Sequence, residues 1–112
     1  MKIEIKNLRT SKIEHEWQVR VDRQSVLGNP FYMHNESFRD DVCDKYALYF
    51  EKKIASDDVA FINELCRLAN IALKYGKLEL FCWCAPKRCH AETIKSFIEQ
   101  LVSEQINQLT NA

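Results

Sequence analysis

Three of the five cysteines and one of the three histidines lie close together, in the segment Cys82-Trp83-Cys84-Ala85-Pro86-Lys87-Arg88-Cys89-His90. Thiolates act as nucleophiles and metal ligands, and imidazole acts as a base or a metal ligand. Such a cluster is more typical of a functional site than of core packing. It shows where chemistry would take place and leaves open which reaction, if any, occurs.

Cys89 is the candidate nucleophile. It falls at the start of a predicted helix, where unpaired backbone N–H groups and the helix dipole favour an anion, and Lys87 and Arg88 add positive charge. Both effects lower a thiol pKa, so we expect Cys89 to be the most reactive of the cysteines. His90 is the candidate base, although adjacent helical residues point about 100° apart. The alternative is a half-buried thiol that only caps the helix.

The remaining cysteines have simpler interpretations. Cys82 in a strand, and Cys43 and Cys66 on apolar helix faces, are predicted to be core residues, because cysteine is often buried. Cys84 stands at the mouth of the loop and is a candidate ligand contact. Zinc bound by Cys82, Cys84, Cys89 and His90 is an alternative, but the spacing is poor for a structural zinc site, so we assign no metal ligands.

A second unusual loop follows an earlier strand and contains the segment from Arg23 to Phe31. Gly28 permits a positive φ or a close approach of a ligand, and Asn29, held extended before a proline, can bond a ligand or the loop itself. Arg23 and Arg39 are candidate charges for an anionic ligand. The alternative is that these residues form only a rigid turn.

Hydrophobic periodicity predicts the elements that position both loops. Apolar residues alternate with polar ones in two stretches, repeat at helical spacing in three, and run nearly unbroken in one. A capping box of Ser37 and Asp40 is predicted near the first helix start. The predicted elements are strands over 3–5, 17–21 and 78–83, and helices over 35–53, from 56 to Gly76, and from about His90 to Leu109.

This order predicts one small α/β domain over residues 1–112, with a short, mainly parallel, Rossmann-like sheet packed with about three helices. The long helical crossover between the second and last strands favours parallel pairing, and the apolar last strand belongs in the middle of the sheet. Both loops then leave the same edge. We therefore expect Gly28 and Cys89 to line one pocket.

Composition excludes several classes of function. Sixteen basic residues balance 16 acidic ones, so no net charge draws the chain to nucleic acid or to an anionic membrane. No stretch approaches the roughly 20 apolar residues of a spanning helix, and the first residues lack a signal-peptide core. An odd number of cysteines argues for reduced thiols. We expect a cytoplasmic protein without a membrane or nucleic-acid partner.

The two loops resemble those of the bacterial and phage family catalogued as domain of unknown function 4326. The matching residues are Arg23, Ser25-Val26-Leu27-Gly28-Asn29-Pro30-Phe31, Arg39, Tyr46, Leu80, Cys82-Trp83-Cys84-Ala85-Pro86 and Cys89-His90. The resemblance implies that nine of these residues share one site or one folding core: Gly28, Asn29, Pro30, Phe31, Arg39, Cys84, Pro86, Cys89 and His90. It carries no established activity.

These observations lead to one functional hypothesis and two alternatives. The hypothesis is a small cytosolic domain that binds a small anionic or nucleotide-like ligand between the two loops, with Arg23, Gly28, Asn29, Arg39 and Cys84 as ligand contacts. Whether it also processes that ligand, through Cys89 and His90, is left open, as are any cofactor and the oligomeric state. The alternatives are a phage or bacterial accessory module that binds a protein, with structural cysteines, and a zinc-stabilised domain.

Overall fold

The computed structural model describes residues 1–110, and its elements follow the predicted order. Three parallel strands and three α-helices make an α/β domain, which confirms the predicted fold class. The elements are β1 (Lys2–Asn7), β2 (Gln18–Arg20), the 3-10 helix η1 (Glu36–Phe38), α1 (Arg39–Ala55), α2 (Val59–Tyr75), β3 (Lys77–Cys82) and α3 (Ala91–Thr110).

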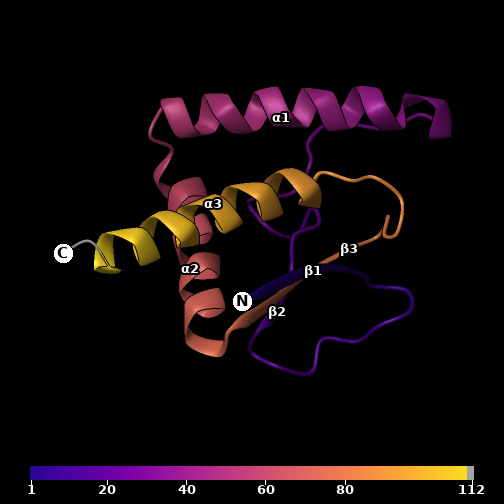
Figure 1. Ribbon diagram of the computed structural model, residues 1–112. Helices are drawn as coiled ribbons and strands as arrows, with labels where there is room; N and C mark the ends of the chain where they lie inside the picture. The colour runs from indigo at the N-terminus through magenta and orange to yellow at the C-terminus, as the bar shows by residue number, and fades with distance from the viewer. Residues whose placement is uncertain (111–112) are drawn as a thin grey trace.

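The sheet has the order β1-β3-β2, so the most apolar strand is central, as predicted. Ile3 lies opposite Leu78, and Val19 lies opposite Leu80. Strand β2 is shorter than the predicted 17–21, yet its pairing continues at both ends, where Trp17 accepts a backbone hydrogen bond from β3 and Val21 donates one to it. Because all strands are parallel, β2 and β3 end at the same edge (Figure 1).

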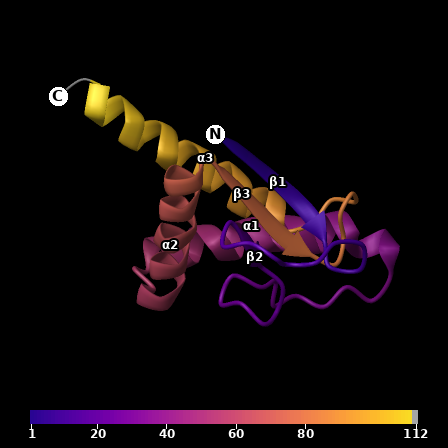
Figure 2. The same ribbon diagram turned by 90° about the horizontal axis from the view of Figure 1, so that it is seen from below.

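All three helices lie on one side of the sheet, as Figures 1 and 2 show from two directions. Helices α2 and α3 pack on the strands, and α1 packs against α2 and α3. Ile3, Val19, Leu78 and Leu80 form the buried face of the sheet, and Phe81 of the central strand is fully buried on the opposite face. The opposite face carries an exposed network in which Glu4 pairs with two lysines.

The helix boundaries have local causes. Asp58 caps α2 by accepting a hydrogen bond from the Phe61 N–H group, and Gly76 ends the helix in the left-handed conformation, at φ 71°. The predicted capping box at Ser37 is wrong. Asn35 caps the chain there instead, accepting from Ser37 N–H, and a 3-10 turn precedes α1.

Two details of the predicted core need correction. Cys43 and Cys82 are buried as predicted, but Cys66 is exposed, because it lies on the solvent side of α2. Phe97 is only partly buried, whereas Ile94 and Ile98 on the same helix are fully buried. Among residues 1–110, no helix is long and apolar enough to cross a membrane.

Candidate functional site

A pocket of about 390 Å³ lies at the carboxyl edge of the sheet, between the loop after β2 and the loop after β3. Both loops contribute to it, as the parallel topology predicts. Its lining residues are Arg20, Asp22, Arg23, Gln24, Asn29, Phe31, Met33, Arg39, Val42, Cys43, Cys82, Trp83, Cys84, Arg88, Cys89 and His90. Of the predicted site residues, only Gly28 does not line this pocket.

The environment of Cys84 favours a reactive thiolate. It lies in the loop after β3 and is partly exposed. A hydrogen bond from Cys89 and the nearby Arg39 guanidinium together lower the pKa of Cys84 from 9.0 to about 5, against the opposing effect of burial. Arg39 is itself only 14% exposed and is held by Glu36. Cys89 and Arg39 therefore favour the thiolate form of Cys84.

Cys89 does not have the properties that its position in the sequence suggests. Its side chain is 4% exposed, and its Sγ lies 3.3 Å from the Sγ of Cys82. Hydrogen bonds to Cys82 and Cys84, together with burial, raise the pKa of Cys89. The contact with Cys89 also lowers the pKa of Cys82, to about 7. Burial and these contacts favour Cys84, rather than the predicted Cys89, as the more reactive thiol.

His90 joins the start of α3 to the end of β2. Its Nε2 lies 2.5 Å from the carbonyl oxygen of Val21, so this nitrogen carries the proton and donates to the end of the β2 strand. The ring is 8% exposed and packs edge-on against Tyr46, with centroids 5.0 Å apart. Burial lowers the pKa of His90, so the imidazole is neutral. No described contact joins it to a cysteine sulfur.

Asn29 and Arg23 are turned toward their own loop. The Asn29 side-chain amide donates to the Val42 carbonyl and accepts from the Phe31 N–H group. The Arg23 guanidinium donates to the carbonyls of Asn29 and Phe31, at 3.1 and 3.2 Å. These bonds give the loop a fixed shape. Both residues still line the pocket, and Arg23 has no carboxylate partner among the described ion pairs.

A glycine is needed at position 28 because backbone atoms of the same loop, and not a ligand, approach it closely. A Cβ atom added there would lie 2.6 Å from both the Arg23 Cα and the Asp22 carbonyl oxygen. The neighbouring Leu27 is fully buried, and its carbonyl accepts a 2.6 Å hydrogen bond from the Tyr46 hydroxyl. The loop is therefore folded back on itself and fastened to α1.

Replacing Gly28 with Ala is expected to destabilise the protein by about 1–3 kcal/mol, because the new methyl group overlaps backbone that must move. The free energy of unfolding in urea measures this cost. Val26→Ala is the matched control, since Val26 is 46% exposed in the same loop and should change stability by no more than about 0.5 kcal/mol. Equal effects of the two changes would contradict the close packing at Gly28.

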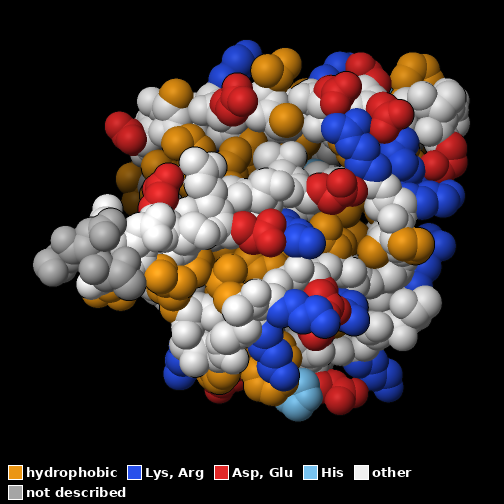
Figure 3. All heavy atoms as spheres, viewed as in Figure 1, with side chains coloured by type: hydrophobic (Ala, Val, Ile, Leu, Met, Phe, Trp, Pro, Cys, Tyr) orange, Lys and Arg blue, Asp and Glu red, His pale blue; other side chains and the backbone are white. Residues whose placement is uncertain are grey.

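Ion pairs join the β3 loop to the start of α1 across the rim of the pocket. Arg88 contacts Asp40 and Asp44 at 3.0 and 2.9 Å, and Lys87 contacts Glu36 at 3.3 Å. Basic and acidic side chains alternate at this corner of the molecule, at the upper right of Figure 3. The positive charges that we expected to activate Cys89 are thus paired with acidic side chains of η1 and α1.

Asp22 and Trp83 belong to the site although we did not assign them to it. Asp22 is 8% exposed, accepts from the Trp83 indole N–H at 2.9 Å, and is paired with Arg20. The Arg20 hydrogen bond lowers the pKa of Asp22 despite its burial. The Trp83 ring is 49% exposed. Asp22 could have been predicted as a site residue from the sequence, because it is a carboxylate that directly follows a strand at the carboxyl edge of the sheet.

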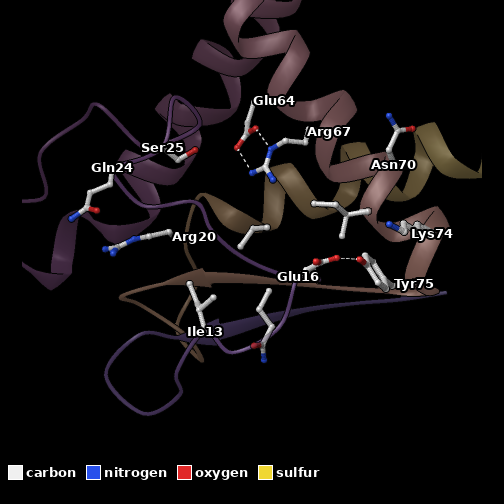
Figure 4. A pocket seen from close by; sticks show the side chains of 13 residues that line it. Ile13, Glu16, Arg20, Gln24, Ser25, Glu64, Arg67, Asn70, Lys74 and Tyr75 are labelled. Atoms are coloured by element: carbon white, nitrogen blue, oxygen red, sulfur yellow. Dashed lines mark hydrogen bonds and ion pairs between the residues drawn. The ribbon is translucent and has the colours of Figure 1, made fainter.

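A larger groove of about 870 Å³ lies between β2 and α2. Figure 4 shows its charged groups facing one another: Arg67 pairs with Glu64, and Tyr75 donates to Glu16. Among the described residues that line it, there is no cysteine or histidine. In the same described part of the chain, no group of three or more His, Cys, Asp or Glu residues is arranged to hold a metal ion.

Comparison with known proteins gives one family match, and that match spans both loops. A family model described as a domain of unknown function, DUF4326, matches residues 5–100, which include both loops and all three strands except the start of β1. The chain belongs to the DUF4326 family. No curated protein and no solved structure matches it, so the Rossmann-like description stays a prediction. Membership in the DUF4326 family assigns no activity, which must be argued from the site.

Proposed function

We propose that this protein binds a small anionic or nucleotide-like molecule in the pocket between the two loops. The observation that carries the proposal is the lining itself, which contains four arginines, one of which, Arg23, has no carboxylate partner among the described ion pairs. The volume of about 390 Å³ lies within the range of small-molecule sites. Reduced thiols suit a reducing cytoplasm, where we place the protein.

The polar and aromatic groups favour a ligand with both a charge and a flat ring. Arg23 is fixed by loop carbonyls and keeps its charge without a described carboxylate partner, so an anionic group can approach it. Trp83 presents a half-exposed ring in the same pocket, where a planar base could stack. Cys84 is the residue that could react with the ligand. Whether a reaction takes place is a separate question from binding.

Thermal unfolding with a panel of nucleotides and phosphorylated sugars tests the proposal. A ligand at about 100 times its Kd adds about 2.7 kcal/mol of stability, which raises the melting temperature by several degrees. We expect at least one compound to do so, and expect Arg23→Met to abolish the shift. Arg67→Met, which removes a guanidinium from the other groove, should leave it unchanged.

Arg23 also supports its loop, so each variant is first measured without ligand. A lower melting temperature for Arg23→Met alone reports the lost loop bonds, and the ligand-induced shift is compared with that new baseline. The proposal fails if no compound of the panel stabilises the wild-type protein. It fails also if Arg23→Met and Arg67→Met reduce the shift equally.

A further inference from the structure

The three thiols at the end of β3 and the start of α3 are close enough for disulfide chemistry. The Sγ atoms of Cys82 and Cys89 lie 3.3 Å apart, and Cys84 lines the same pocket, close enough to Cys89 for the Cys89 thiol to lower its pKa. A disulfide bond is about 2.0 Å long, so a small side-chain movement brings Cys82 and Cys89 to bonding distance. Cys89 thus has Cys82 in contact and Cys84 nearby.

The three thiols differ in their access to solvent. Cys84 is partly exposed and faces the pocket and Arg39, whereas Cys82 and Cys89 are 1% and 4% exposed. An oxidant that enters the pocket therefore meets Cys84 first. The second thiol, that of Cys89, is buried and out of contact with water. This is the arrangement of an attacking cysteine and a resolving cysteine.

We propose that Cys82, Cys84 and Cys89 form a two-electron thiol redox centre, in which a hydroperoxide oxidises Cys84 and Cys89 closes a disulfide. The proposal goes beyond ligand binding and does not require the pocket to hold any other molecule. Disulfides in a reducing compartment are usually transient and catalytic or redox-sensing, which fits thiols placed beside a binding pocket.

The chemistry balances in two steps. The Cys84 thiolate attacks one peroxide oxygen, the O–O bond breaks, and hydroxide leaves and takes up a proton, which gives the sulfenic acid and water. The Cys89 sulfur then attacks the Cys84 sulfur, the S–O bond breaks, and a second water leaves with the Cys89 proton. Two thiols are oxidised and one hydroperoxide is reduced.

A third step can move the disulfide inward. Cys82 attacks the Cys89 sulfur of the new disulfide, its proton passes to solvent, and the Cys84 thiolate is released. Arg39 stabilises that leaving thiolate, which favours the exchange. The final product is a Cys82–Cys89 disulfide, with Cys84 again available in the pocket.

Peptide mapping tests the proposal directly, because trypsin separates Cys89, in peptide 89–95, from Cys82 and Cys84, in peptide 78–87. The Cys66→Ser chain, which avoids intermolecular links through that exposed thiol, is treated with a small excess of hydrogen peroxide, blocked with N-ethylmaleimide and digested. We expect the two peptides to be linked, with a loss of two hydrogen atoms that dithiothreitol reverses.

Single variants assign the roles. Cys89→Ser should give no link and should leave a Cys84 sulfenic acid that dimedone captures. Cys84→Ser should slow the linkage at least about tenfold, since the thiolate is lost. Cys82→Ser should retain the link, now at Cys84. Circular dichroism verifies that each variant is folded.

The proposal is overturned if the folded Cys66→Ser chain shows no linked peptide when glutathione in the same tube has been fully oxidised. It is overturned equally if the link forms as fast in folded Cys84→Ser as in its parent, because the pocket thiol would then take no part. Both results come from measurements that need no ligand, so they are independent of the proposed binding function.

Discussion

Iodoacetamide at about pH 6 is expected to alkylate Cys84 before any other cysteine, and about tenfold faster than a small free thiol in the same tube. With a pKa of about 5 the Cys84 thiol is mostly ionised at that pH, whereas an ordinary thiol, with a pKa near 8.5, is less than about 1% ionised. A less basic thiolate is also less nucleophilic, which offsets part of this advantage. Labelling is followed by peptide mass over time.

The pH dependence is the sharper measurement. The Cys84 rate should stay nearly constant above about pH 6 and fall only as the pH approaches the folded pKa of about 5, where the thiolate becomes protonated. Arg39→Met should raise that pKa and move the profile to higher pH, and Arg67→Met should not. A rate that still rises steeply at neutral pH, or faster labelling of Cys89, would contradict the assignment.

Phe61→Ala is expected to cost about 3–5 kcal/mol of stability, the largest effect of any single replacement considered for this protein. The Phe61 side chain is 1% exposed, and its ring packs against those of Tyr49 and Phe50, with centroids 6.1 and 5.2 Å away. Removing it opens a cavity between α1 and α2. Urea unfolding gives the change in midpoint.

Two further replacements calibrate that result. Val59→Ala on the same helix removes a side chain that is 70% exposed and should change stability by no more than about 0.5 kcal/mol. Phe97→Ala should cost less than Phe61→Ala, because Phe97 is only partly buried and touches the cluster through Phe50, at 5.2 Å. A larger loss at Phe97 would mean that α3 contributes more to the core than its burial indicates.

The architecture could be predicted because it depends on local signals. Alternation, the Asp58 cap and the Gly76 stop mark the ends of elements, and a long helical crossover between two strands favours their parallel pairing. That topology alone placed the two loops at one edge. The short η1 turn escaped prediction because Asn35 and Ser37 are both good caps, and only the path of the chain selects between them.

The reactive thiol could not be predicted, because its environment comes from distant parts of the chain. Arg39 reaches Cys84 from α1, and Arg88, which seemed to favour Cys89, is occupied by acidic residues of that same helix. For a similar reason Arg23 and Asn29 look like free ligand-binding groups in the sequence, but Arg23 bonds its own loop and Asn29 bonds both its own loop and α1. Spacing along the chain shows which residues are close in sequence. It does not show which hydrogen-bond or ion-pair partners each side chain has in the folded protein.

The ion pairs that join the β3 loop to α1 have a practical consequence. The side chains of Arg88, Asp40 and Lys87 are 41%, 83% and 61% exposed, so these pairs are screened by dissolved salt. Dissolved salt does not screen the packing of the aromatic side chains in the core. We therefore expect high ionic strength to loosen the rim of the pocket while the domain stays folded, so rates of Cys84 labelling should be compared at a single salt concentration.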